Sequence, residues 1–313
     1  MIVAITGATG FIGRCLVNRH LEMGDEVRVL TRKLEPKFPN DVKIYNYSLL
    51  NKDGDLIKFV DGADILYHCA AEIRDETIMY EVNVEGTANL IEAAKNKVKR
   101  WVQLSSTGVY GPVFKGIVNE KQNLNPINTY EKSKVESDSL VISAGKRGYF
   151  NYTIMRPSNV FGPDMINKSL FQFIKAIDKG LFFFIGKEGA NANYVPVENV
   201  VHALVLAGKS DIAIGKTYNI SDYLELERFV EVIAKLLNVP VPSFRVPLVF
   251  MKVLGKIGDM VPKSPLTTGR VLALTNRVIY ENTLLENELG YSPIISIEDG
   301  VHNLVNRYKI EKL

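Results

Sequence analysis

Along the first half of the chain, short apolar, β-branched runs alternate with longer stretches in which apolar residues recur at helical spacing. Runs that are apolar at nearly every position predict strands buried on both faces, as in a parallel sheet covered by helices. The predicted strands are residues 2–5, 27–30, 42–45, 65–69, 101–104 and 152–155. The predicted helices are residues 11–23, 53–60, 79–96 and 129–144. This alternation predicts an α/β fold with a doubly wound parallel sheet.

The regular alternation of strands and helices ends after residue 156. From there prolines and glycines become frequent, and the predicted helices lack clear strands between them. Two further strands are predicted at residues 193–197 and 217–220, and both could rejoin the sheet. Helices of a smaller lobe are predicted at residues 224–237, 248–257 and 283–289. We therefore expect one domain from residues 1–156 plus about 195–221, and a discontinuous C-terminal lobe from about 157–194 plus 222–313.

A glycine-rich turn joins the first predicted strand to the first helix. Gly7 permits a tight turn, Gly10 allows a phosphate close to the backbone, and Gly13 lets helix and strand pack closely. The helix N-terminus then offers free N–H groups to the phosphates. A plain glycine turn is the alternative, but the position in a strand–helix–strand chain favours a Rossmann-type dinucleotide site. The expected contacts of the turn are Gly7, Thr9, Gly10, Phe11, Ile12 and Gly13.

The end of the second strand bears on the choice of dinucleotide. An acid that binds the adenosine ribose of NAD is usual at this position, but Thr31 stands here and Arg32 and Lys33 follow. Two cations without a carboxylate favour the 2′-phosphate of NADP, with NAD as the alternative. Alternatively, Arg32 and Lys33 are solvated surface residues that contact no dinucleotide.

Tyr130 and Lys134 are four residues apart in a predicted helix, which places them on one face, one turn apart. A tyrosine pKa of about 10 is high for acid–base work at neutral pH, and a neighbouring ammonium is expected to lower it. Such a pair alone is common on protein surfaces. Ser106, however, follows a predicted buried strand, where sites on open parallel sheets form, and its hydroxyl can hydrogen-bond a substrate carbonyl.

Several segments together resemble the extended short-chain dehydrogenases/reductases, the NAD-dependent epimerase/dehydratase group. They are TGATGFIG at 6–13, ADILYHCAA at 63–71, NVEGT at 83–87, LSSTGVYG at 104–111, the Tyr130/Lys134 pair, RPSNVFGP at 156–163, LGYSP at 289–293 and IEDG at 297–300. The resemblance implies a dinucleotide-binding domain followed by a substrate-binding lobe.

The resemblance also implies roles for individual residues. Tyr130 is the proton donor or acceptor, Lys134 holds the nicotinamide ribose, and Ser106 polarises the substrate. Further cofactor contacts are implied for Ser48, Leu49, Ala70, Ala71, Asn83 and Pro157. Substrate contacts are expected from Thr107, Asn159 and Arg270. A homodimer is implied, formed by the helices at 79–96 and 129–144, although both helices could simply face the sheet.

The sequence departs from some members of this group. Sugar-nucleotide dehydratases carry an acid pair where Thr107 and Gly108 stand, and neither of these residues does acid–base chemistry, so we do not expect a dehydratase. Members that use nucleotide-diphosphate sugars often carry an arginine where Ala192 stands. Arg270 could supply a diphosphate contact, or it could be an ordinary surface cation.

Composition narrows the remaining classes. The formal net charge of +3 and the interleaved acids and bases do not indicate a nucleic-acid partner. The four histidines lack ligand spacing, so no metal site is expected. Neither a signal peptide nor a long apolar span is evident, so we expect a cytoplasmic protein without a membrane partner.

Three functions remain open. The first is an NADP-dependent reductase acting on the keto group of a nucleotide-activated sugar or a similar carbonyl compound. The second is a nucleotide-sugar 4-epimerase with tightly held NAD. The third is a non-catalytic dinucleotide sensor, which the joint presence of Ser106, Tyr130 and Lys134 disfavours.

Overall fold

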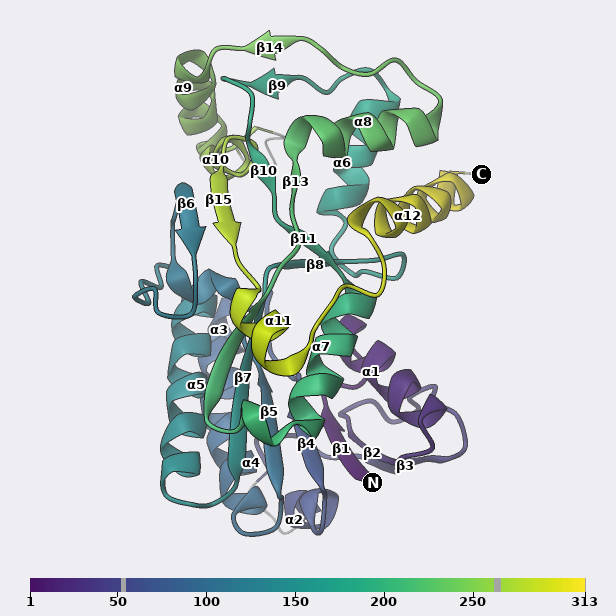
Figure 1. The fold of residues 1–313 in the computed structure, drawn as a ribbon, viewed down its shortest axis with the longest axis vertical. Coiled ribbons are helices and arrows are strands. Elements are labelled where there is room, and N and C mark those ends of the chain that lie inside the picture. Colours follow the sequence, from purple (N-terminus) through teal and green to yellow (C-terminus); the bar gives the residue numbers. More distant parts are fainter. Residues whose placement is uncertain (52–54, 262–265, 313) are drawn as a thin grey trace.

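A sheet of seven parallel strands forms the centre of the first domain (Figure 1). The protein is described by a computed structural model covering residues 1–51, 55–261 and 266–312. The strand order is β3-β2-β1-β4-β5-β7-β12. These strands are β1 (Ile2–Thr6), β2 (Glu26–Leu30), β3 (Val42–Tyr45), β4 (Ile65–His68), β5 (Arg100–Leu104), β7 (Asn151–Pro157) and β12 (Lys216–Ile220). The doubly wound α/β prediction is confirmed.

Helices cover both faces of the sheet, because successive side chains of a strand point to opposite faces. On β1, Val3 and Ile5 pack into one apolar cluster and Ala4 into another. The first cluster lies under α1 (Phe11–Glu22) and α7 (Val197–Lys209). The second lies under α2 (Asp55–Val60), α4 (Gly86–Ala94) and α5 (Thr129–Lys146). The start of the helix predicted at 53–60, Asp53, lies outside the described residues.

The long helix predicted at 79–96 consists of three parts. These are α3 (Glu76–Tyr80), a π-helical turn (Glu81–Glu85) and α4. Asp75 begins α3 by accepting a hydrogen bond from the Thr77 backbone. π-Helical turns often occur at functional sites, and this one contains Asn83.

Two further apolar clusters hold the smaller lobe together. Its helices are α6 (Ser169–Asp178), α8 (Leu226–Leu237), α9 (Leu248–Asp259), α10 (Thr268–Ala273) and α12 (Ile297–Lys312). Short strand pairs join distant segments: β6 (Lys115–Val118) with β15 (Arg277–Tyr280), β8 (Asn159–Phe161) with β11 (Tyr194–Pro196), β9 (Phe184–Ile185) with β14 (Arg245–Val246), and β10 (Asn191–Ala192) with β13 (Leu224–Glu225).

The structure corrects three expectations in this half of the chain. The strand predicted at 193–197 pairs with β8 and does not rejoin the main sheet. The sequence did not predict helix α7, which follows it directly. The helix predicted at 283–289 is present as α11 (Thr283–Leu289), but its Leu285 packs into the cluster under α1 and α7. The division into two domains stays a prediction.

Three apolar side chains of α4 and α5 that suggested a dimer face the interior of this chain, while Ala88 and Leu140 are half-buried. Leu90, Ile91 and Val141 are buried within the subunit against the sheet. Packing on the sheet is therefore enough to explain them, and the homodimer stays a prediction.

Candidate active site

The turn after β1 leaves no room for a Cβ atom at Gly7 or Gly13. Gly7 has a positive φ of +69°, and a Cβ there would lie 2.6 Å from the Ala70 backbone nitrogen. A Cβ on Gly13 would lie 2.3 Å from the Gly7 carbonyl oxygen. Glycine at these positions lets α1 begin directly against the turn, with Gly10 as its N-cap. The first N–H groups of α1 have no partners within the helix, so they suit a phosphate group.

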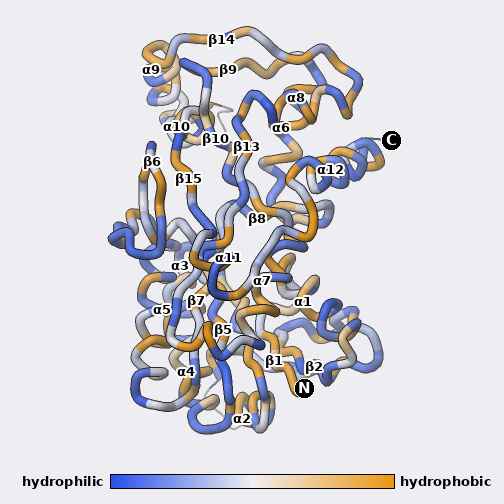
Figure 2. Tube along the Cα trace, in the orientation of Figure 1, coloured by the Kyte–Doolittle hydropathy of each residue, from blue (hydrophilic) through white to orange (hydrophobic). Residues whose placement is uncertain are grey.

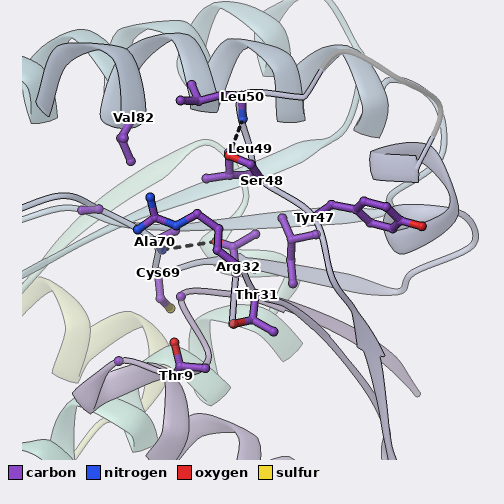
Figure 3. Close-up of a pocket in the computed structure, with 15 residues that line it drawn as sticks. Thr9, Thr31, Arg32, Tyr47, Ser48, Leu49, Leu50, Cys69, Ala70 and Val82 are labelled. Carbon is purple, nitrogen blue, oxygen red and sulfur yellow. Dashed lines mark hydrogen bonds between the residues drawn. The ribbon is translucent and has the colours of Figure 1, made fainter. Parts of the chain in front are cut away.

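A cavity of about 210 Å³ lies beside this turn, where β1, β2 and β4 end (Figure 3). Nine of the predicted cofactor residues line it: Gly7, Thr9, Gly10, Thr31, Arg32, Ser48, Leu49, Ala70 and Ala71. The described lining includes Arg32 and no aspartate or glutamate. Lys33 is not part of that lining, and its backbone N–H donates to the Thr31 hydroxyl. These features fit the adenosine end of a dinucleotide.

A second cavity, of about 860 Å³, adjoins the first and shares Gly7, Gly10, Cys69 and Ala71 with it. The two form one groove along the carboxyl ends of the strands, where ligands of doubly wound folds bind. Predicted site residues that line the second cavity are Phe11, Ile12, Gly13, Ser106, Tyr130, Lys134, Pro157 and Asn159. The structure thus brings the glycine turn and the Tyr130 group (Ser106, Tyr130 and Lys134) to one groove.

Helix α5 presents Tyr130 and Lys134 to this cavity. Asn128 caps the helix by accepting from the Glu131 backbone N–H, and the Glu131 carboxylate accepts in return from the Asn128 backbone. Ser106 and Tyr130 are joined by a side-chain hydrogen bond. The Lys134 ammonium donates to the Leu104 carbonyl at the end of β5, 2.5 Å away. The three side chains therefore meet at the carboxyl end of β5.

The pKa of Tyr130 differs from the expectation. Burial raises it to about 12, which outweighs the lowering by the Ser106 hydrogen bond. Lys134 is not among the groups that lower this pKa, and its ammonium donates instead to the Leu104 carbonyl. Burial also lowers the pKa of Lys134 itself. At neutral pH the Tyr130 hydroxyl therefore keeps its proton, as a proton donor must.

Sequence reasoning missed a buried ionic group behind Lys134. Asp138 lies one turn further along α5 and accepts a hydrogen bond from the Ser105 hydroxyl at 2.6 Å. The Arg156 guanidinium is 3.8 Å from the same carboxylate. Burial raises the pKa of Asp138, while Lys134 and Arg156 lower it. The spacing of four from Lys134 was the available signal, since it puts both side chains on one helix face.

Asn83 supports the groove from behind. Its side-chain oxygen accepts from the Glu72 N–H at 2.7 Å, and its amide donates to the Glu72 carbonyl and the Ser133 hydroxyl. It does not line either cavity. It ties the loop after β4 to α5, so its role is indirect.

His68 is buried at the end of β4 with both ring nitrogens engaged. Its ring nitrogens hydrogen-bond the Thr6 and Thr87 hydroxyls, and burial lowers its pKa to about 3.

Two expected substrate contacts do not reach the described lining of either cavity. Thr107 is buried in the turn after Ser106, where its side chain hydrogen-bonds Tyr280. Arg270 belongs to α10, and its guanidinium donates to the Gln172 side chain on α6. Substrate contacts from these two residues therefore stay predictions, without support from the cavity lining.

Comparisons with known proteins agree with this site. The chain is 30% identical to the 3beta-hydroxysteroid-dehydrogenase/decarboxylase isoform 2 of Arabidopsis thaliana, over 83% of this chain and 51% of that protein. It therefore spans about half the length of that relative. It is 27% identical to the decarboxylating sterol-4-alpha-carboxylate 3-dehydrogenase of Bos taurus, over 97% of this chain and 91% of the relative.

The fold matches the crystal structure of the UDP-glucuronic acid 4-epimerase from Bacillus cereus in complex with NAD. The TM-score is 0.76 at 20% identity, with 100% of both chains covered. A family profile matches residues 3–221, which contain the glycine turn and the Tyr130 group. The chain is thus an NAD(P)-dependent enzyme of the short-chain dehydrogenase/reductase superfamily, and it belongs to the NAD dependent epimerase/dehydratase family.

Proposed function

We propose that this enzyme interconverts a ketone and a secondary alcohol, with Tyr130 as the proton donor in the direction of reduction. The observation that carries the proposal is the meeting of Ser106, Tyr130 and Lys134 at one cavity. A bound nicotinamide supplies or accepts the hydride. The Tyr130 hydroxyl, with its raised pKa, holds the proton that the substrate oxygen needs in reduction.

The neighbouring side chains have distinct tasks. Ser106 hydrogen-bonds Tyr130 and can share the substrate oxygen with it. Lys134 lies deep in the cavity, where its ammonium suits the nicotinamide ribose and polarises the Leu104 carbonyl. The Asp138 carboxylate favours the charged form of Lys134 against the cost of burial.

The lining of the larger cavity favours a substrate with an apolar body. On the side of the second lobe its larger side chains are Phe161, Met165, Ile166, Leu170 and Tyr194, while its cations, Arg74 and Lys134, belong to the first domain. A nucleotide diphosphate seated against the second lobe would find no cation in that part of the described lining. We therefore favour a carbonyl compound other than a nucleotide-activated sugar. The hydroxysteroids named for the relatives are substrates of this kind.

We propose NADP as the preferred dinucleotide. The smaller cavity presents the Arg32 guanidinium, and its described lining carries no carboxylate that would repel a 2′-phosphate. Thr31 stands where NAD enzymes place an acid.

A panel of substrates tests the proposal. Purified enzyme is incubated with NADP⁺ or NAD⁺ and either 3-hydroxysteroids or UDP-sugars, and formation of the reduced dinucleotide is followed by absorbance. We expect dinucleotide reduction with an apolar secondary alcohol. Inversion of a UDP-sugar at C4 without net dinucleotide reduction would instead identify the epimerase.

A further inference from the structure

Helix α9 carries apolar residues on the side that faces away from the protein. Met251, Gly255 and Gly258 are its buried residues, and they mark the side packed on α10. The opposite side is made of large aliphatic and aromatic residues: Val249 is 73% exposed, Phe250 65%, Val253 56%, Leu254 47% and Ile257 53%. Met260 and Val261, which follow the helix, are 84% and 54% exposed.

Packing within the chain does not explain why the exposed face of α9 is apolar. A helix that needs only to pack on a core carries one apolar stripe and is polar elsewhere. Here the packed stripe contains two glycines, and the bulkier apolar residues lie outside it. Single exposed apolar residues are normal on proteins, but a contiguous apolar patch marks a surface that binds something.

The charge around this patch is one-sided. Lys252 and Lys256 are both exposed and lie together along one edge of the apolar face. Asp259, the nearest acid in the sequence, accepts a hydrogen bond from the Thr268 backbone N–H at 3.0 Å. From residue 232 to residue 280 the sequence has seven basic residues and only this one acid. The patch therefore complements a surface that is both apolar and negatively charged.

The position of α9 leaves the patch accessible. The helix lies at the end of the second lobe, away from the central sheet and the N-terminus (Figures 1 and 2). No helix in the described part of the chain is long and apolar enough to cross a membrane. A 12-residue helix with an apolar face and lysines beside it has instead the form of a helix that lies flat in a lipid interface.

We propose that α9 docks the enzyme on an anionic lipid surface. The five apolar side chains enter the boundary between headgroups and acyl chains, and Lys252 and Lys256 contact the lipid phosphates. A second copy of this chain fits less well. A two-fold contact through α9 would bring the lysines of both copies together, and lysine is depleted in protein interfaces.

Sedimentation with lipid vesicles tests this docking without any substrate, so its outcome is independent of the proposed reaction. The full chain is mixed with vesicles of phosphatidylcholine alone or of equal parts phosphatidylcholine and phosphatidylserine. We expect binding to the mixed vesicles, weakened by added salt, and much weaker binding to phosphatidylcholine alone. The Val253→Ser/Ile257→Ser variant and the Lys252→Glu/Lys256→Glu variant should each bind at least roughly tenfold more weakly.

The matched control is Ile212→Ser/Ile310→Ser, which changes two equally exposed isoleucines at 56% and 63% exposure elsewhere on the surface. It should bind like the wild type, and circular dichroism checks that all variants are folded. Equal vesicle binding by the α9 variants and the wild type would overturn the proposal. The proposal would also be overturned if the wild type did not bind vesicles and formed a dimer that only the Val253→Ser/Ile257→Ser variant loses. A second copy of the chain would then cover the patch.

Discussion

The two ends of the groove differ in the kind of groups that form their walls. At the adenosine end the walls are close-packed backbone, and the space for a ligand depends on glycines such as Gly7 and Gly13. At the catalytic end the walls hold buried ionisable groups, with Lys134 and Asp138 3% and 2% exposed. The difference implies that changes at the first end alter mainly affinity for the dinucleotide, and changes at the second alter mainly turnover.

Lys134→Met should have the largest effect, because Lys134 belongs to both functions. We expect turnover to fall by more than about a hundredfold and dinucleotide binding to weaken as well. Measured kcat and dinucleotide Kd decide this. Lys132→Met, an exposed lysine on the same helix, is the matched control. A change confined to the KM of the carbonyl substrate would show that Lys134 does not serve the dinucleotide.

The adenosine end can be tested with two glycines of similar backbone conformation. Gly7 and Gly24 have φ values of +69° and +74°, but a Cβ would clash at Gly7 and meets nothing within 4 Å at Gly24. Gly24→Ala should cost about 1 kcal/mol of unfolding free energy from strain alone. Gly7→Ala should add about 1–3 kcal/mol from overpacking and weaken dinucleotide binding. Urea unfolding and dinucleotide titration give both quantities, and equal behaviour of the two variants would contradict the account.

Arg32→Ala and Lys33→Ala sharpen the choice of dinucleotide. Together they should weaken NADP binding far more than NAD binding. Because only Arg32 lines the cavity, Arg32→Ala alone should account for most of the loss, roughly tenfold to a hundredfold for one charge-assisted contact. Lys33→Ala is then the control. Equal weakening of NAD and NADP binding, measured by calorimetry, would rule out a 2′-phosphate contact.

Arg270→Ala should have the smallest effect. The side chain donates to Gln172 outside the described cavity lining, so kcat/KM should stay within a few-fold of the wild type. A large rise in the KM for a nucleotide sugar would show that Arg270 reaches the substrate after all, and would favour the nucleotide-sugar function.

Local spacing explains which features were predictable. The glycine turn and the Tyr130/Lys134 pair each depend on residues a few positions apart. The structure has the turn at the start of α1 and the pair on α5, as predicted. Helix α7 was missed because valines at positions 197, 200, 201 and 205 are β-branched and the helix is apolar almost all round, like a buried strand. The strand pairs of the second lobe join segments far apart in sequence, as in β9 with β14.

Long-range contacts explain the remaining errors at the site. The Asp138–Arg156 pair links α5 to β7, and nothing in either segment alone indicates the partner. The expected lowering of the Tyr130 pKa was not found because helix spacing places Lys134 nearby but does not show how deeply Tyr130 is buried.

Tyr130→Phe tests the central claim most directly. The substrate is the ketone that corresponds to the secondary alcohol identified in the panel. On one preparation, kcat for its reduction and the dinucleotide Kd are measured for the wild type, for Tyr130→Phe and for Tyr80→Phe, a half-exposed tyrosine on α3. The account predicts that Tyr130→Phe lowers kcat by about a hundredfold to ten-thousandfold with Kd nearly unchanged, and that Tyr80→Phe does neither. A Tyr130→Phe enzyme within a few-fold of wild-type kcat would show that Tyr130 is not the proton donor.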